Sequence, residues 1–211
     1  MVLRVTLVAW SSPRGGDPRR IIVLAAKTSQ GKLSLETLQH YLNDYPEKDV
    51  HGWILASAGF PSVLEHISFT FLIEGISRVT SHQLVRHRIA SYTQESQRYA
   101  RAEYDYIVPE SVRLGNFEER FRNVVEEALR LYKEMVDAGI PYEDARYVLP
   151  QAVTTKILMT VNLRELLHIA CLRLSDKAQW EIRELVKLML DEASKVVPEV
   201  YDLLRASCTE R

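Results

Sequence analysis

The stretch RHRIASYTQESQR, residues 86–98, holds an unusual concentration of arginine and hydrogen-bonding side chains. With its flanks, residues 78–101, it contains five arginines, no lysine and a single acid, Glu95. Arginine presents a planar fork of N–H donors that matches phosphate or carboxylate, whereas lysine offers a point charge. The hydroxyl and amide side chains between the arginines add further donors and acceptors. The stretch therefore predicts a pocket for a compact anion.

The charge balance of the whole chain limits which anion this is. The sequence has 27 basic and 28 acidic side chains, a net charge of −1. Five arginines and one glutamate give residues 78–101 a charge of +4, which leaves −5 for the remainder. A protein that binds the phosphate backbone of a nucleic acid usually has a basic surface over an entire domain. A single short basic segment favours a nucleotide or a phosphorylated metabolite as the ligand, and no nucleic-acid partner is expected.

Length and composition predict one domain over residues 1–211. The chain is long enough for a substantial core, and no low-complexity linker or internal repeat divides it. The first residues lack a signal-peptide pattern, and no apolar run approaches the roughly 20 residues that span a bilayer. Cys171 and Cys208 are too few for a disulfide framework, and Cys171 has the surroundings of a core residue. We expect a cytoplasmic protein in a reducing compartment, with no membrane partner.

The hydrophobic periodicity predicts more helices than strands. Alternating and β-branched segments predict strands over residues 2–10, 69–75, 104–108 and 153–161. Helical spacing and capping residues predict helices over residues 17–27, 34–42, 46–57, 77–86, 116–138, 142–148, 163–172 and 178–197, with one helical turn from Ser62. The strands are scattered rather than regularly alternating with helices. This pattern is typical of an α+β fold, and we expect a mixed sheet flanked by helices.

Standard ligand-binding motifs are absent. Neither glycine loop of dinucleotide or phosphate binding occurs, and the six histidines include no His-x-x-x-His pair. We therefore expect no metal site. Arg86-His87 resembles the Arg-His-Gly of histidine phosphatases, although Arg88 adds bulk where that loop has glycine. A phosphohydrolase using His87, and a nucleotide- or RNA-binding module without chemistry, are the alternatives to be weighed.

The spacing within the arginine stretch matches a known family. Arg86-His87-Arg88, seven residues and then Ser96 resembles the signature of flavin-dependent thymidylate synthases. The segment EHISFTF, residues 65–71, resembles the family segment that precedes this signature. Further matches follow in the family's order at residues 77–78, 82–83, 98–99, 146–150, 162–166, 172–173 and 178–182. From this series, which covers roughly residues 57–182, the chain is identified as a member of that family.

The resemblance implies an activity and its cosubstrates. Enzymes of this family convert dUMP to dTMP, with methylenetetrahydrofolate as the one-carbon donor and NADPH as the reductant. They bind FAD without a Rossmann domain, so the missing glycine loop is then expected. The resemblance further implies an α+β fold and a homotetramer whose active sites lie at subunit contacts.

The resemblance also assigns site residues. For dUMP it implies Gln83, Leu84, Val85, Arg86, Gln94, Glu95, Ser96, Gln97, Arg98, Arg146 and Arg173. For FAD it implies Ser62, Arg86, His87, Arg88, Gln94, Asn162, Leu163, Arg164 and His168. Physical chemistry supports both sets, because Arg98 with the backbone amides beside it can hold a dianionic phosphate. Cationic side chains near a flavin stabilise its reduced, anionic ring.

Arg173 is the expected catalytic residue, since it matches the family arginine that holds the pyrimidine and favours loss of its N3 proton. Ser96 is not expected to be a nucleophile, because a serine needs an adjacent base and His87 is nine residues away without an orienting carboxylate. The implied mechanism passes hydride from reduced flavin to the pyrimidine without an enzyme nucleophile. Orientation and electrostatic activation would then be the protein's contributions.

Two positions depart from the family pattern. Phe60 stands where many relatives have a histidine near the flavin and folate, and Lys177 stands where some have histidine. Neither imidazole is therefore available to this chain at those positions.

Overall fold

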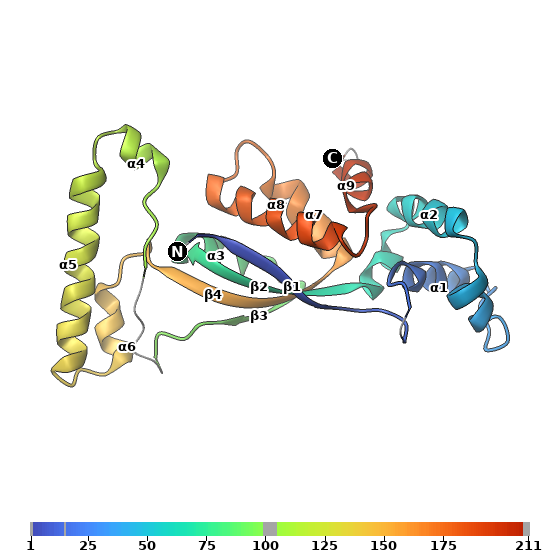
Figure 1. The fold of residues 1–211 in the computed structure, drawn as a ribbon, viewed down its shortest axis with the longest axis horizontal. Helices are drawn as coiled ribbons and strands as arrows, with labels where there is room; N and C mark the ends of the chain where they lie inside the picture. Colours follow the sequence, from blue (N-terminus) through green and yellow to red (C-terminus); the bar gives the residue numbers. More distant parts are fainter. Residues whose placement is uncertain (1, 15, 99–104, 209–211) are drawn as a thin grey trace. The chain divides into compact units, whose positions relative to one another are not determined.

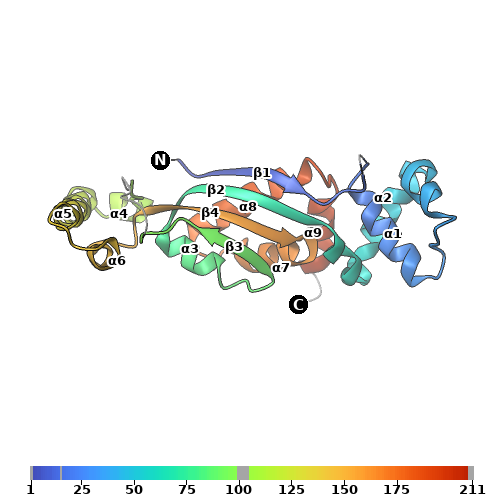
Figure 2. The same cartoon turned by 90° about the horizontal axis from the view of Figure 1, so that it is seen from below.

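The computed structural model describes residues 2–14, 16–98 and 105–208, which contain a four-stranded sheet. Its strands are β1 (Arg4–Trp10), β2 (Ser68–Ser77), β3 (Ala90–Gln94) and β4 (Thr154–Asn162), in the order β1-β2-β4-β3 (Figure 2). Neighbouring strands are antiparallel: Ser11 N donates to Ser68 O at one end of the β1–β2 pair, and Arg4 contacts Glu74 at the other. The α+β class is confirmed, whereas the sheet is antiparallel rather than mixed.

Helices make up most of the remaining described chain (Figure 1). They are α1 (Arg19–Ser29), α2 (Glu47–Ala56), α3 (Arg78–Leu84), α4 (Glu110–Leu114), α5 (Glu118–Asp137), α6 (Tyr142–Ala145), α7 (Leu163–Arg173), α8 (Trp180–Ser194) and α9 (Val200–Cys208). Irregular helical turns are η1 (His40–Asp44), η2 (Ser57–Gly59), η3 (Pro61–His66) and η4 (Arg146–Val148). None of the described helices is long and apolar enough to cross a bilayer.

The described chain divides into two compact units. The first holds the residues up to Arg4, Ile73–Arg86 and Thr93–Ile157; the second holds Val5–Leu72, His87–Tyr92 and the residues from Leu158 onward. Every strand passes from one unit to the other, so each unit carries part of the sheet. One domain over residues 1–211 stays a prediction.

In the second unit, strand alternation buries one face of the sheet. Phe69 and Phe71 of β2, with Met159 of β4, are fully buried, because successive side chains point to opposite faces. Helices α7 and α8 lie behind the strands in Figure 2 and cover this face. On the opposite face Leu72 is 37% exposed and Leu158 is 42% exposed. This second face is therefore partly apolar and open.

Strand β2 is longer than the sequence pattern predicts. The predicted strand ends at Gly75, but β2 continues to Ser77. Gly75 has φ +75°, and a Cβ there would lie 2.6 Å from the carbonyl oxygen of Val2. Glycine therefore allows the residues just before β1 to approach closely without ending the strand. Ser77 then caps α3 by accepting from Thr80 N, so the arginine stretch begins just after a helix, as predicted.

Five further segments differ from the sequence prediction. Residues 90–94 form β3, whose outward side chains Ser91 and Thr93 are polar and give no apolar alternation. Tyr106 forms only an isolated bridge with Val153, and Tyr104 lies outside the described residues. The predicted helix at residues 34–42 begins later, at residue 38, and continues as the π-helix η1 to Asp44. The short helices α4 and α9 are additional.

The two cysteines form a disulfide, which corrects the prediction of a reduced Cys171 in the core. Cys171 of α7 and Cys208 of α9 are bonded at 1.99 Å, with Cα atoms 5.5 Å apart. The separation of 37 residues does not predict this disulfide. The two sulfur atoms meet because α9 packs on α7. The two cysteines therefore give no indication of a reducing compartment.

Breaking this disulfide is expected to destabilise the protein. A bridge that closes a loop of this length restricts the unfolded chain and contributes about 2–4 kcal/mol. Cys208→Ser is expected to lower the free energy of unfolding by about that amount, measured by urea denaturation. Reductant should destabilise the wild type to the same level and leave the variant unchanged. A wild type insensitive to reductant would contradict the bridge.

Candidate functional site

The second unit contains a cavity of about 600 Å³ beside α7 and η3, a volume in the range of cofactor sites. Apolar and charged side chains share its wall. The lining residues are Ala58, Pro61, Leu64, Glu65, Ile89, Asn162, Arg164, Glu165, Leu167, His168, Cys171 and Ser207. Ile89 belongs to the arginine stretch, and Cys171 is half of the disulfide. The cavity is therefore built by segments far apart in the sequence.

The start of α7 determines which side chains reach the cavity. Asn162 ends β4 and caps α7, because its side-chain oxygen accepts from Glu165 N at 2.8 Å. Leu163 is fully buried, and its N–H donates to the carbonyl of Ile67 at 2.8 Å. Helical spacing then places Arg164 and His168, four residues apart, on one face. The position of the cap therefore determines which way Arg164 and His168 point around the helix axis.

The cavity brings together three of the residues assigned to FAD from the sequence: Asn162, Arg164 and His168. Ser62 and Leu163 adjoin lining residues in the chain, and Arg88 precedes Ile89 on the exposed surface. Arg86 and Gln94 belong to the first unit. Arg164 also forms an ion pair with Glu65 across the cavity wall.

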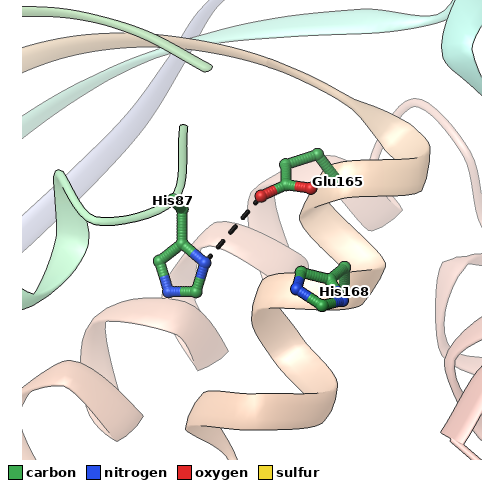
Figure 3. A group of neighbouring side chains, drawn as sticks. All are labelled: His87, Glu165 and His168. Atoms are coloured by element: carbon green, nitrogen blue, oxygen red, sulfur yellow. Dashed lines mark ion pairs between the residues drawn. The ribbon is translucent and has the colours of Figure 1, made fainter. Parts of the chain in front are cut away.

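His87 lies in a cluster with Glu165 and His168 (Figure 3). Its Nδ1 is 3.8 Å from Glu165 Oε1, and the two imidazole rings meet edge-on with centroids 6.3 Å apart. On its other side, His87 Nε2 accepts a hydrogen bond from Arg173 Nε at 3.0 Å. Glu165 is not among the site residues predicted from the sequence. Its position one turn before His168 on α7 is the signal that could have found it.

The electrostatics of the cluster keep His87 neutral. The imidazole is 6% exposed, and burial together with the charges of Arg173 and His168 lowers its pKa to about 4. Burial also raises the pKa of Glu165, against the opposing effect of His168 and Arg164. Because Nε2 of a neutral His87 accepts from Arg173, its single proton must be on Nδ1, the nitrogen that faces Glu165.

The cluster has the donor types of a metal site, which no sequence motif predicts. Ligand atoms of His87, Glu165 and His168 lie within 4.8 Å of one another. A metal on His87 Nδ1 would move the ring proton to Nε2, where it would meet the N–H of Arg173. The hydrogen bond between Arg173 and His87 therefore opposes metal binding at this place.

In the first unit, α6 joins two of the arginines assigned to dUMP. Arg98 contacts one carboxylate oxygen of Glu143, Oε2, from both Nε at 3.0 Å and Nη2 at 2.9 Å. The carbonyl of Glu143 accepts from Arg146 Nε at 3.1 Å, and Ser96 Oγ accepts from Arg98 N at 3.1 Å. The sequence neighbourhood of Arg98 is poor in acids, so Glu143, 45 residues further on, was not foreseen as its partner.

The other residues assigned to dUMP have different surroundings. Gln94 donates to Ser81 Oγ at 3.1 Å and to Thr155 Oγ1 at 3.3 Å, and the carbonyl of Glu95 accepts from Arg78. At the end of α3, Leu84 is fully buried. Gln83 and Gln97 are half-buried, while Val85 and Arg86 are exposed. Arg173 belongs to the second unit.

Known proteins match this chain over most of its length. Residues 7–199 match the family described as thymidylate synthase complementing protein. The flavin-dependent thymidylate synthase of Pyrococcus furiosus is 46% identical over 201 residues, covering 92% of this chain and 80% of that protein. The enzyme of that name from Geobacter sulfurreducens is 45% identical over 194 residues, covering 88% and 81%.

A solved structure has the same fold. The UMP/dUMP methylase PolB from Streptomyces cacaoi, bound with 5-Br dUMP, matches with a TM-score of 0.82 and 25% identity, covering 97% of this chain and 95% of that chain. The named relatives and this structural neighbour thus define an enzyme of the methyltransferase class. The chain belongs to the family of flavin-dependent thymidylate synthases.

The lowered pKa of His87 predicts how stability depends on pH. Between pH 6.5 and about 4, the unfolded chain binds a proton at this imidazole that the folded chain does not. The contribution of His87 therefore makes the free energy of unfolding fall as the pH drops through this window, by about 2 kcal/mol. Between pH 7 and pH 4.5, the free energy of unfolding of His87→Gln is expected to fall by about 2 kcal/mol less than that of the wild type, measured by urea denaturation. Equal losses in both proteins would contradict the prediction.

Proposed function

We propose that this chain synthesises dTMP from dUMP, with methylenetetrahydrofolate as the one-carbon donor and NADPH as the reductant through bound FAD. Family membership supports the reaction class. The single observation that carries the proposal is the cavity in which Asn162, Arg164 and His168 meet. A cytoplasmic location is part of the proposal.

The cavity suits a flavin chemically. Pro61, Leu64 and Leu167 provide an apolar surface, while Arg164 and His168 provide polar nitrogens on one side. We assign FAD to this cavity, with Asn162, Arg164 and His168 as its contacts and with Ser62, His87, Arg88 and Leu163 around them. Arg86 and Gln94 are assigned to FAD by the resemblance alone. When bound, the flavin supplies the hydride that reduces the pyrimidine.

The phosphate of dUMP is assigned to Arg98, Ser96 and Arg146. Arg98 Nε and Nη2 already hold one carboxylate oxygen of Glu143, so this edge of the guanidinium is oriented toward an anionic oxygen. Ser96 Oγ fixes the backbone of Arg98, which supports a binding role for Ser96. The remaining assigned residues, Gln83, Leu84, Val85, Arg86, Gln94, Glu95 and Gln97, complete the proposed set.

Arg173 is assigned to the pyrimidine, where a fixed cation stabilises charge that develops as the N3 proton is lost. Its Nε is held by His87, so the guanidinium plane has a defined orientation. His87 in turn has Nε2 accepting from Arg173 and Nδ1 facing Glu165, so neither nitrogen is placed as a base or nucleophile. This arrangement weighs against a phosphohydrolase that uses His87.

We further propose a homotetramer, with active sites at subunit contacts. The face of the second unit's sheet opposite α7 and α8 carries Val8, 48% exposed, beside the half-exposed Leu72 and Leu158. Thr70 and Thr160 form a hydrogen bond between them on the same face. An exposed apolar patch on a sheet is typical of a surface that another subunit covers.

Formation of dTMP is the direct test of the activity. The purified protein is expected to be yellow, to release FAD on denaturation and to form dTMP from dUMP, methylenetetrahydrofolate and NADPH. Arg173→Ala is expected to lower kcat about 10²–10³-fold, since it removes the activating cation. The control is Arg130→Ala, an exposed α5 arginine paired with Glu127, which should keep full activity. A colourless protein that takes up no FAD would overturn the proposal.

The open sheet face can be tested by assembly. Leu158→Glu places a charge on the apolar patch and is expected to convert the tetramer to smaller species, measured by light scattering after size exclusion. Leu35→Glu, at a position 90% exposed outside the sheet, is the matched control and should remain tetrameric. A tetramer unaffected by Leu158→Glu would place the contact elsewhere.

A further inference from the structure

We infer that Glu165 and His87 are positioning residues that set the orientation of Arg173. Glu165 holds the ring proton of His87 on Nδ1, which leaves Nε2 to accept from Arg173 Nε. This inference deepens the proposed function, because it rests on Arg173 activating the pyrimidine.

Arg173 needs such a contact because of its place in the fold. It is the last residue of α7, and its long side chain has several rotatable bonds. A hydrogen bond at Nε, 3.0 Å from His87 Nε2, restrains both the direction of the side chain and the rotation of the guanidinium plane. An activating cation must be held in place before the reaction, since reorienting it during the reaction would raise the barrier.

The tautomer of His87 determines whether this hydrogen bond exists. Protonated on Nε2, the ring would present an N–H to the N–H of Arg173, and the two donors would repel. Glu165 Oε1 lies on the Nδ1 side at 3.8 Å and favours the Nδ1 proton electrostatically. That separation is longer than a hydrogen bond, and contacts within catalytic sites often shorten when substrate binds.

The remainder of His87 is also restrained. The hydroxyl of Tyr92, in β3, donates to the His87 carbonyl at 2.9 Å. Burial and the charge of Glu165 raise the pKa of Tyr92, so the phenol keeps the proton it donates. Tyr92 thus holds the backbone of His87 and Arg173 holds its ring, while Glu165 lies on the Nδ1 side. Glu165 and Arg173 lie on the same helix, so the helix carries both the orienting acid and the group that is oriented.

A carboxylate that orients a histidine is a common arrangement in other kinds of site. In hydrolase triads and metal sites, a carboxylate fixes the tautomer of a histidine, which then acts on a nucleophile or a metal. Here the histidine acts on a guanidinium. Glu165 and His87 are therefore positioning residues in this proposal, and Arg173 is the group that touches substrate.

The tautomer is measured first, because it does not depend on activity. Long-range ¹⁵N NMR of protein labelled in histidine is expected to show His87 protonated on Nδ1 and unprotonated on Nε2 at pH 7. In Glu165→Ala the Nε2-protonated form should increase. Glu184→Ala, an exposed carboxylate on α8, is the matched control and should give the wild-type spectrum. A wild-type His87 protonated on Nε2 would overturn the inference.

Kinetics at saturating FAD and dUMP then measure the consequence. Glu165→Ala is expected to lower kcat for dTMP about ten-fold or more with little change in the KM for dUMP, since orientation affects the transition state. His87→Gln keeps an acceptor near the Nε2 position and should be more active than His87→Phe, which keeps the ring shape alone. Equal kcat values for these two variants, with FAD bound in both, would overturn the inference.

The two proposals fail in different ways. If the wild type forms no dTMP but shows the Nδ1 tautomer, the proposed function fails and the Glu165–His87–Arg173 arrangement stands. If dTMP forms and Glu165→Ala retains both the wild-type tautomer and the wild-type kcat, the positioning role fails alone.

Discussion

The junction between β4 and α7 is the constraint on which the site depends. Asn162 ends a buried strand and caps the helix that follows, while Leu163 ties the helix start to Ile67. From this one point, helical geometry places Arg164, Glu165 and His168 along the cavity. It also places Arg173 at the end of the helix. A shift of one residue in the cap would rotate each of these side chains by about 100° and dismantle the cavity wall.

His87 links this helix to the arginine stretch. It is buried, uncharged at neutral pH and held between groups from α7. A charged imidazole there would repel Arg173, and the lowered pKa prevents this over the physiological range. A single histidine that looks in the sequence like a candidate nucleophile is therefore better understood as an acceptor for an arginine. The disulfide at Cys171 joins the same helix to α9, so α7 is restrained near both ends.

In the first unit, two arginines that we propose for phosphate binding are held in place by one residue of the same chain. Arg98 and Arg146 both contact Glu143, one through its carboxylate and the other through its carbonyl. Two arginines without such a partner would repel each other. Nε and Nη2 of Arg98 both contact the Oε2 oxygen of this carboxylate, so the guanidinium edge already holds one anionic oxygen. Order at this cluster thus comes from α6, a helix of four residues.

The sequence by itself determined the fold class, most elements and the family, because these depend on local periodicity, caps and motif spacing. Strand β4, the Asn162 cap and helix α7 were all predictable, since each is encoded within a few neighbouring residues. Only the tertiary structure decided the partners: Glu165 for His87, Glu143 for Arg98 and Cys208 for Cys171. These pairs join residues tens of positions apart. Their contacts arise when whole helices and strands pack together. No local repeat or motif in the sequence encodes that packing.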